Sequence, residues 1–547
     1  MMRRTISSYT LLFTSVSAIL GSGWLFAAYY TSKLAGPAAI LSWLIGGFAV
    51  GVVAFIFAEL CAMMPISGSS TRIPQYTHGS VVSFIFSWII WLSYASLVPT
   101  EVQAVLQYVS FFFPNVVHAN GGLTEIGYGL ATILMLLVSA INIFSLRWLL
   151  RSNSILTVIK IFIPIVISIM VLIAFFSPHH VLLPAHTKFM PFGLHGMFAA
   201  IATGGIVYAF NGFKQACELA GEAKRPYVTL PFAIIGSIVV CLIIYLLLQG
   251  AFLSSLNVSN LGHGWANLHL YAANSPMASI IYQDHFNSLL PILYVGAIVG
   301  PFAAALMYMS SASRSLYGMS MNKQIPSIFK KLTVEGNPAC SIVTTFILGM
   351  CLFAPLPGWK SMITFLTSLM AVTYAIAPIC LLALRYQAPK HNRPFKLPFA
   401  TVWATTAFYI CTLLIYWSGW AIISKLGIAI LIGFAVLLIH HYLINRSNKS
   451  PLHWRPSLWM WPYFIGITLI SYLGNFGGGR GLIPFGWDFV LIAVFTIAIM
   501  MMAVKFRMPA EETAAYLLRL KHGESSPDAP TSPSVEEEEP PILEGET

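Results

Sequence analysis

The sequence predicts an all-α polytopic membrane protein, and three observations lead to this fold class. Hydrophobic residues make up 57% of the 547 residues, charged residues make up only 9%, and the mean hydropathy is +0.78. This composition is far too apolar for a soluble protein of this length. Windows of about 20 apolar residues, the length that an α-helix needs to cross a bilayer, recur along the chain. Basic residues gather in alternate loops between these windows.

Fourteen windows are apolar and long enough to be membrane spans, and twelve spans remain possible because the ninth window is short and the last two are weak. We expect the first window to be a retained span rather than a signal peptide, because many further spans follow it. The predicted spans are residues 9–31, 37–63, 80–113, 125–146, 154–177, 194–218, 228–253, 287–315, 340–356, 361–385, 399–420, 424–444, 457–475 and 486–506.

The distribution of positive charge predicts that both termini are cytoplasmic. If the N-terminus lies inside, the loops predicted to be cytoplasmic hold 22 of the 29 Lys and Arg residues. The predicted outer loops hold only Lys33, Lys188, Lys360 and Arg480. If one span were counted wrongly, the basic residues of every later loop would be assigned to the opposite side of the membrane. We therefore expect a multi-pass protein of the cell (inner or plasma) membrane.

Small residues interrupt two of these spans near the middle of the membrane. Gly21, Ser22 and Gly23 stand together in the first span, and residues 204–213 of the sixth span contain three glycines. Unwound backbone at this depth is tolerated only where it is buried in protein or faces a watery cavity. Paired broken helices in the two halves of a chain are typical of a transporter's substrate site. The alternative is a cluster of small residues that serves helix packing.

Several blocks in the first 400 residues resemble the amino acid-polyamine-organocation (APC) superfamily of transporters. The blocks are residues 19–26, 58–60 with 65–68 and Tyr76, 208–213 with 222–226, 313–319 with 324–326, and 393–398. The resemblance implies a LeuT-like fold in which residues 1–398 form two inverted repeats of five helices, with helices 1 and 6 broken at the site. Residues 399–507 are then accessory transmembrane helices, whose role is open.

A free amino acid carries a carboxylate and an ammonium group, and both are costly to remove from water unless they are hydrogen-bonded. The N–H groups of Gly21, Ser22 and Gly23, at the start of a half-helix, suit the carboxylate. The carbonyls of Leu20 and of residues 208–210 suit the ammonium group. The resemblance implies the same assignment.

Further substrate-binding candidates lie in the second interrupted span. Tyr208 and Phe210 are predicted to form an aromatic lid over the substrate, as sixth-span aromatic residues do in the superfamily that the chain resembles, and ordinary core packing is the alternative for both. Asn211 and Gly212 belong to the same interrupted stretch and complete the predicted substrate site there.

Lys160 lies in the middle of the fifth predicted span, where an ammonium group is costly and marks a functional site. It resembles the fifth-span lysine of the proton-dependent, sodium-independent branch of the superfamily, whose amine takes the place of a sodium ion. We therefore predict that Lys160 takes part in proton coupling and that sodium is not the coupling ion. A static buried cation is the alternative.

Lys214, in the inner half of the sixth span, gives a weak preference for acidic or small polar substrates, because a cation there repels arginine and lysine. A lysine that faces an inner vestibule or pairs with Glu218 is the alternative.

Glu101 is the most isolated acid within the spans, and it is the second candidate for coupling. It is predicted either to pair with a basic group or to relay protons. A static hydrogen bond is the alternative.

The sequence thus predicts a secondary active amino acid transporter that works by alternating access. An exchanger of amino acids or amines is one alternative, and an amino acid sensor with a transporter fold is another. We expect no enzyme, because the spans hold no paired catalytic acids and no histidine–glutamate metal motif. We also expect no metal, cofactor or nucleic-acid site. The expected partners are an amino acid, protons and the lipid bilayer.

Residues 508–547 have a different composition from the rest of the chain. They hold ten of the 18 acidic residues, many prolines and serines, and little that is apolar. This composition predicts a disordered acidic cytoplasmic tail. A solvated tail is the simplest interpretation, and a gate plug or partner-binding segment is the alternative.

Overall fold

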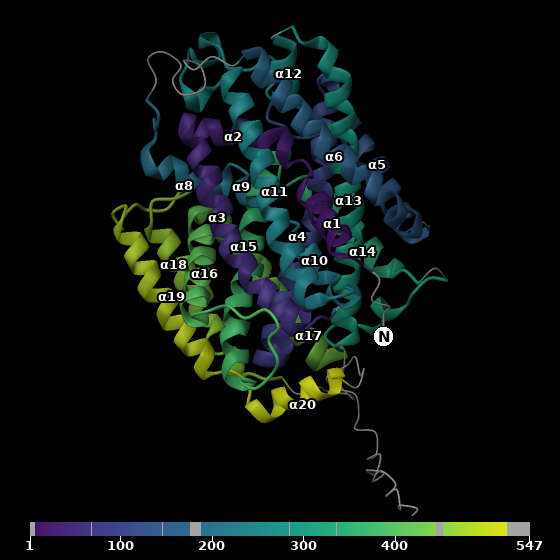
Figure 1. Ribbon diagram of the computed structural model, residues 1–547, viewed down its shortest axis with the longest axis vertical. Coiled ribbons are helices and arrows are strands. Elements are labelled where there is room, and N and C mark those ends of the chain that lie inside the picture. Colours follow the sequence, from purple (N-terminus) through teal and green to yellow (C-terminus); the bar gives the residue numbers. More distant parts are fainter. Residues whose placement is uncertain are drawn as a thin grey trace, which may run out of the picture.

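The computed structural model describes residues 6–66, 68–144, 146–175, 188–283, 285–334, 336–444 and 452–521, which form helices and no strand. Long helices run side by side in one bundle (Figure 1). α20 (Ala510–Lys521) lies at one end of the bundle, here called the terminal end. The opposite end, here called the distal end, carries α12 (Pro276–Gln283).

The first five predicted spans form the first half of the core. The helices are α1 (Ser8–Ile19), α2 (Gly23–Ala35), α3 (Ala39–Met63), α4 (Ser69–Val109), α5 (Glu125–Phe144) and α6 (Leu146–Phe175). α4 begins earlier than predicted, because the stretch after α3 is already helical. Its backbone leaves helical geometry at Gly79, with φ 74° and ψ −169°, so α4 is kinked there.

The second half of the core repeats this order. The helices are α8 (Gly193–Thr203), α9 (Ile206–Ala209), α10 (Gln215–Glu218), α11 (Pro226–Ser254), α13 (Leu290–Met321), α14 (Ala339–Leu352) and α15 (Gly358–Gln387). α1 with α2, and α8 with α9 and α10, are thus the first members of their halves, and both are interrupted.

Four further helices follow the core in the chain. They are α16 (Ala400–Trp417), α17 (Trp420–Ile439), α18 (Met460–Leu473) and α19 (Trp487–Lys505). Of these, α16, α18 and α19 lie together on one side of the core (Figure 1). Each of the fourteen predicted windows contains helix. Ten helices among the described residues are long and apolar enough to cross a membrane by themselves. The total of fourteen or twelve spans stays a prediction.

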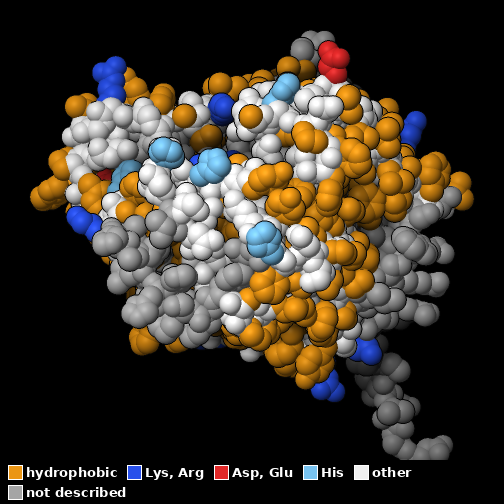
Figure 2. All heavy atoms as spheres, turned by 90° about the horizontal axis from the view of Figure 1, so that it is seen from above, with side chains coloured by type: hydrophobic (Ala, Val, Ile, Leu, Met, Phe, Trp, Pro, Cys, Tyr) orange, Lys and Arg blue, Asp and Glu red, His pale blue; other side chains and the backbone are white. Residues whose placement is uncertain are grey.

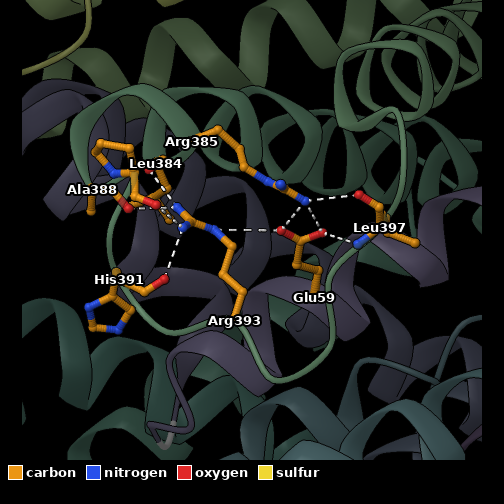
Figure 3. A network of polar contacts seen from close by, with 8 residues as sticks. Glu59, Leu384, Arg385, Ala388, His391, Arg393 and Leu397 are labelled. Carbon is orange, nitrogen blue, oxygen red and sulfur yellow. Dashed lines mark hydrogen bonds and ion pairs between the residues drawn. The ribbon is translucent and has the colours of Figure 1, made fainter.

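An ion-pair network joins the two halves at the terminal end (Figure 3). The buried carboxylate of Glu59, on α3, lies 2.7 Å from Arg385 Nη2 on α15 and 3.8 Å from Arg393 Nε in the following loop. Arg393 also donates to the carbonyls of Leu384 and Ala388, which end α15. Glu59 therefore holds α3 to the C-terminal end of α15.

The prediction of a disordered tail from residue 508 is wrong for its first part, because α20 is helical and packs on the core. The Met508 N–H donates to the Thr77 carbonyl at 2.9 Å, and the Thr513 hydroxyl donates to the Tyr76 carbonyl at 2.9 Å. The average composition of the tail hides the apolar residues of this short segment, such as Leu517. Residues 522–547 lie outside the described residues.

Candidate functional site

The first span is broken at its predicted position. α1 ends at Ile19, Leu20 leaves helical geometry with ψ 69°, and α2 starts at Gly23. The Gly21 N–H donates to the Ile19 carbonyl at 2.9 Å in a tight turn. The N–H of Ser22 points out of the start of α2, where the helix dipole favours a negative group.

The sixth span is broken twice. Gly205, with φ 104°, separates α8 from α9, and residues 210–214 separate α9 from α10. Gly212 has φ 138°, and a Cβ there would lie 2.6 Å from the backbone of Ala18 and Ile19. Only glycine allows the two unwound segments to approach this closely. The two breaks are therefore in direct contact.

The carboxylate of Glu101, from α4, lies inside the break between α1 and α2. Its Oε2 accepts the Ser22 N–H at 2.8 Å, and its Oε1 accepts the Tyr208 hydroxyl at 2.7 Å. Ser22 Oγ lies 2.9 Å from the same hydroxyl. A Cβ on Gly21 would collide with the Glu101 carboxylate. The structure thus brings Glu101 together with three predicted substrate-binding residues.

Trp359, in the first turn of α15, covers this cluster from the distal side. Its indole N–H donates to Ser22 Oγ at 2.8 Å. Phe26 and Tyr30 stack on the indole with ring centroids 4.6 Å and 5.7 Å away. The Tyr208 ring meets it edge-on at 5.4 Å. These aromatic rings close the distal side of the break.

The carbonyls at the end of α1 are held by side chains of other helices. Lys160 Nζ, from α6, donates to the Ser17 carbonyl at 2.9 Å. The Tyr308 hydroxyl, from α13, donates to the Ala18 carbonyl at 2.7 Å, and the Tyr245 hydroxyl, from α11, donates to the Ile19 carbonyl at 3.2 Å. Lys160 is 3% exposed, and its positive charge attracts the negative charge of Glu101. The two side chains do not form a direct ion pair, because the direct ion pairs among the described residues all involve Glu59.

Two of the carbonyls predicted to accept the substrate ammonium group, those of Tyr208 and Ala209, already accept protein donors. The Tyr208 carbonyl accepts the Asn211 N–H at 2.9 Å, and the Ala209 carbonyl accepts the Tyr245 hydroxyl at 2.9 Å. A carbonyl oxygen has two lone pairs, so each can accept a second hydrogen bond. Their role in binding stays a prediction.

Lys214 is buried on the terminal side of the break, among aromatic rings. Its Nζ donates to Thr373 Oγ1 at 2.8 Å and lies 5.0 Å from the Tyr374 ring and 5.7 Å from the Tyr94 ring. The Tyr374 hydroxyl donates to Asn211 Oδ1 at 3.2 Å, whereas Asn211 Nδ2 is buried with no hydrogen-bond partner among the described residues. The site therefore has one spare buried donor beside a cation.

Phe210 and Gly23 serve packing in this structure. Phe210 lies against Trp43 and Tyr245, with centroids 5.9 Å and 5.6 Å away, and contributes to the core beside the break. A Cβ on Gly23 would lie 3.1 Å from Ala209 Cβ, so this glycine lets α2 approach α9. The predicted lid role of Phe210 stays a prediction.

A cavity of about 520 Å³ opens toward the terminal end, beyond α10. It lies between the start of α4, α10 and the C-terminal half of α13. Most of the residues that line it are polar, and they include Arg72, Gln215, Glu218, Ser311 and Arg314. Gln215 and Glu218 follow Lys214 on the same chain segment, so the cavity reaches the terminal side of the second break.

Sequence reasoning missed Trp359, Tyr245 and Tyr308. A tryptophan at the end of a span is also typical of a residue at the membrane surface, and a tyrosine within a span is typical of the core. The sequence signal for Trp359 was the adjacent Pro357 and Gly358, which mark the start of a helix. No signal in the sequence pairs the two tyrosines with the carbonyls of α1.

A family model described as amino acid permease matches residues 6–425. The chain belongs to the amino acid permease family, within the APC superfamily. The permease is similar to the glutamate/serine transporter AimA of Bacillus subtilis, with 33% identity over 515 residues, 92% of this chain and 94% of the relative. It is also similar to the aspartate-proton symporter of Bacillus subtilis, with 31% identity over 500 residues, 91% of this chain and 95% of the relative. At these coverages, both matches extend into the accessory helices.

The fold of the permease also resembles a solved structure. A manganese transporter of Eremococcus coleocola matches with a TM-score of 0.50 and 13% identity, covering 91% of this chain and 96% of that chain. At this identity the similarity concerns the fold alone. The permease is thus a multi-pass membrane protein with the predicted LeuT-like fold, in which the first and sixth helices are broken.

Proposed function

We propose that this permease is a proton-coupled, sodium-independent transporter of acidic or small polar amino acids that works by alternating access. The observation that carries the proposal is the Glu101 carboxylate on the N–H of Ser22, where the substrate carboxylate is expected to bind. The proposed location is the cell membrane, with both termini in the cytoplasm.

Two features support the proposed substrate class. The relatives described above are named as transporters of glutamate, serine and aspartate. In this chain, Lys214 lies buried next to the break, together with Asn211 Nδ2, which has no hydrogen-bond partner among the residues that the structure describes. A cation and a spare donor favour a substrate with an additional acceptor, and they disfavour a cationic substrate.

Coupling follows from competition between two carboxylates for the same donors. The Ser22 N–H and the Tyr208 hydroxyl both donate to the Glu101 carboxylate in the described state. A substrate carboxylate that takes these donors leaves the Glu101 carboxylate buried and unpaired, which is costly. Binding a proton to Glu101 removes this cost. One substrate and one proton therefore enter the site together.

Lys160 supports the absence of sodium from the cycle. Its ammonium group already donates to the Ser17 carbonyl at the end of α1. A sodium ion needs several oxygen ligands at this point, and a fixed positive charge beside it repels the ion. Lys160 also attracts the Glu101 charge, so its field acts on the group that is proposed to bind the proton.

The described structure corresponds to one state of an alternating-access cycle, closed on the distal side and open on the terminal side. The stacked rings of Phe26, Tyr30 and Trp359 close the distal side of the break. The cavity of about 520 Å³ lies on the terminal side. Transport requires a second state in which the aromatic stack separates and the cavity closes.

Uptake by the purified protein in liposomes tests the proposal. We expect accumulation of labelled aspartate, glutamate or serine under an inward proton gradient, without a requirement for sodium. Excess unlabelled glutamate should reduce this uptake more than arginine does. Uptake that needs sodium, or stronger competition by arginine, contradicts the proposal.

The same liposomes separate the alternatives. An exchanger accumulates label only when the liposomes are preloaded with amino acid, and collapse of the proton gradient then has no effect. A sensor binds the amino acid, which thermal stabilisation detects, but moves no label under either condition.

A further inference from the structure

Two lysines lie next to each other at the distal end, beyond the aromatic cover of the site. Lys33 is in the last turn of α2, and its Nζ lies 5.3 Å from the Tyr29 ring centroid. Lys360 is in the first turn of α15, and its Nζ lies 5.2 Å from the Tyr30 ring centroid. The two tyrosine rings are 5.0 Å apart. Cation–π contacts thus hold two ammonium groups over neighbouring rings.

The pair is connected directly to the cover of the site. The Tyr30 ring, under Lys360, stacks on the indole of Trp359, and this indole donates to Ser22 Oγ. Lys360 also follows Trp359 in the chain. A substrate that approaches the break from the distal end therefore meets the two ammonium groups before it meets the aromatic rings.

No direct ion pair among the described residues balances the charges of this pair. The two ammonium groups are close enough to repel each other. Within the described ranges, the direct ion pairs all involve Glu59, so neither lysine has a carboxylate partner. Both side chains are partly exposed. Figure 2, which views the distal end, shows few acidic side chains on this face. The pair therefore creates a local positive potential at the distal end, where we expect the substrate to enter.

We propose that Lys33 and Lys360 form an entry site for acidic amino acids, which binds the side-chain carboxylate before the substrate passes Trp359. An anion between the lysines removes their repulsion, and a positive entrance raises the local concentration of an anionic substrate. A zwitterion such as serine has no net charge and gains little. This inference rests on the proposed transport of acidic amino acids.

Initial uptake rates at several substrate concentrations test the entry site. The double variant Lys33→Gln with Lys360→Gln should raise the KM for aspartate by about tenfold, the lower limit of electrostatic steering, with little change in maximal rate. The KM for serine should stay unchanged. Raising the ionic strength should raise the KM for aspartate in the wild type and not in the double variant.

Two controls make the result specific. Arg480→Gln removes another distal cation, which lies 4.8 Å from the Tyr472 ring, and should leave both KM values unchanged. The variant Lys33→Arg with Lys360→Arg keeps the charge and should retain most of the aspartate affinity.

The outcomes distinguish this inference from the proposed function. If the wild type transports aspartate and the double variant keeps its KM, or if the KM values for aspartate and serine rise together, the entry site is wrong while the proposed function stands. If the wild type transports serine but no acidic amino acid, the entry site is overturned and the proposed function stands for small polar substrates. If the wild type transports neither class under a proton gradient, the proposed function is overturned as well.

Discussion

The backbone N–H of Ser22 donates to Oε2 of Glu101 at 2.8 Å, so a carboxylate of the protein occupies the start of α2. This N–H is one of the donors that the proposed site offers to the substrate carboxylate. Since Glu101 is 1% exposed, it cannot turn into water without a rearrangement of the site. In the proposed mechanism, the binding of substrate and the charge of Glu101 are therefore linked.

We expect Glu101→Gln to uncouple binding from pH. In the wild type, uptake of one proton with the substrate makes the affinity rise as the pH falls, by up to about tenfold per pH unit. The amide of glutamine is neutral at every pH, so affinity should become independent of pH and proton-driven accumulation should be lost. Titration calorimetry at several pH values measures the first effect and liposome uptake the second. A variant with the pH dependence of the wild type contradicts this coupling.

Lys160→Met should abolish uptake driven by a pH gradient. The substitution removes the donor to the Ser17 carbonyl and the positive charge that attracts Glu101. Lys425→Met is the matched control, because this lysine lies on the accessory helix α17 and is exposed. Both variants should be compared in liposomes at equal protein content. Full pH-driven uptake by the Lys160 variant would show that this lysine is a static cation.

The variant Trp359→Phe should make the closed arrangement of the distal side less stable, although it keeps an aromatic ring against Phe26 and Tyr30. The variant loses one buried hydrogen bond to Ser22, worth about 0.5–1.5 kcal/mol, so we expect a KM about two- to tenfold higher. Trp417→Phe is the control, because its buried indole N–H has no hydrogen-bond partner among the described residues. Equal KM values for the two variants would show that the Trp359 hydrogen bond does not help to close the distal side of the break.

Gly212→Ala should destabilise the contact between the two breaks. The residue has φ 138°, and its new Cβ would lie 2.6 Å from Ala18 C and Ile19 N. The backbone strain alone is about 1–3 kcal/mol. We expect a lower melting temperature and loss of transport. The control is Gly427→Ala on α17, where the added Cβ would have no atom within 4 Å other than those of its own stretch of helix, and it should have neither effect. A melting temperature equal to that of Gly427→Ala would mean that the unwound segments do not need this close approach.

Much of the fold was predictable from the sequence, because the membrane imposes simple rules on it. The apolar windows and the interruptions at residues 21–23 and 204–213 follow from composition and small-residue patterns. The core of two five-helix halves was implied by the resemblance to the APC superfamily. α20 was missed because the average composition of a segment conceals a short helix that is stabilised by contacts with Tyr76 and Thr77.

The site was predictable only in part. The sequence alone indicated which residues are unusual at their depth, such as Lys160, Glu101 and Lys214, because a charge within a membrane is costly wherever it points. Only the tertiary structure decided their partners. It placed Glu101 of α4 on Ser22, Lys160 of α6 on Ser17, and Trp359 of α15 over both breaks. A hydrogen bond depends on side chains from distant helices meeting within about 3 Å, and no local pattern along the chain records that distance.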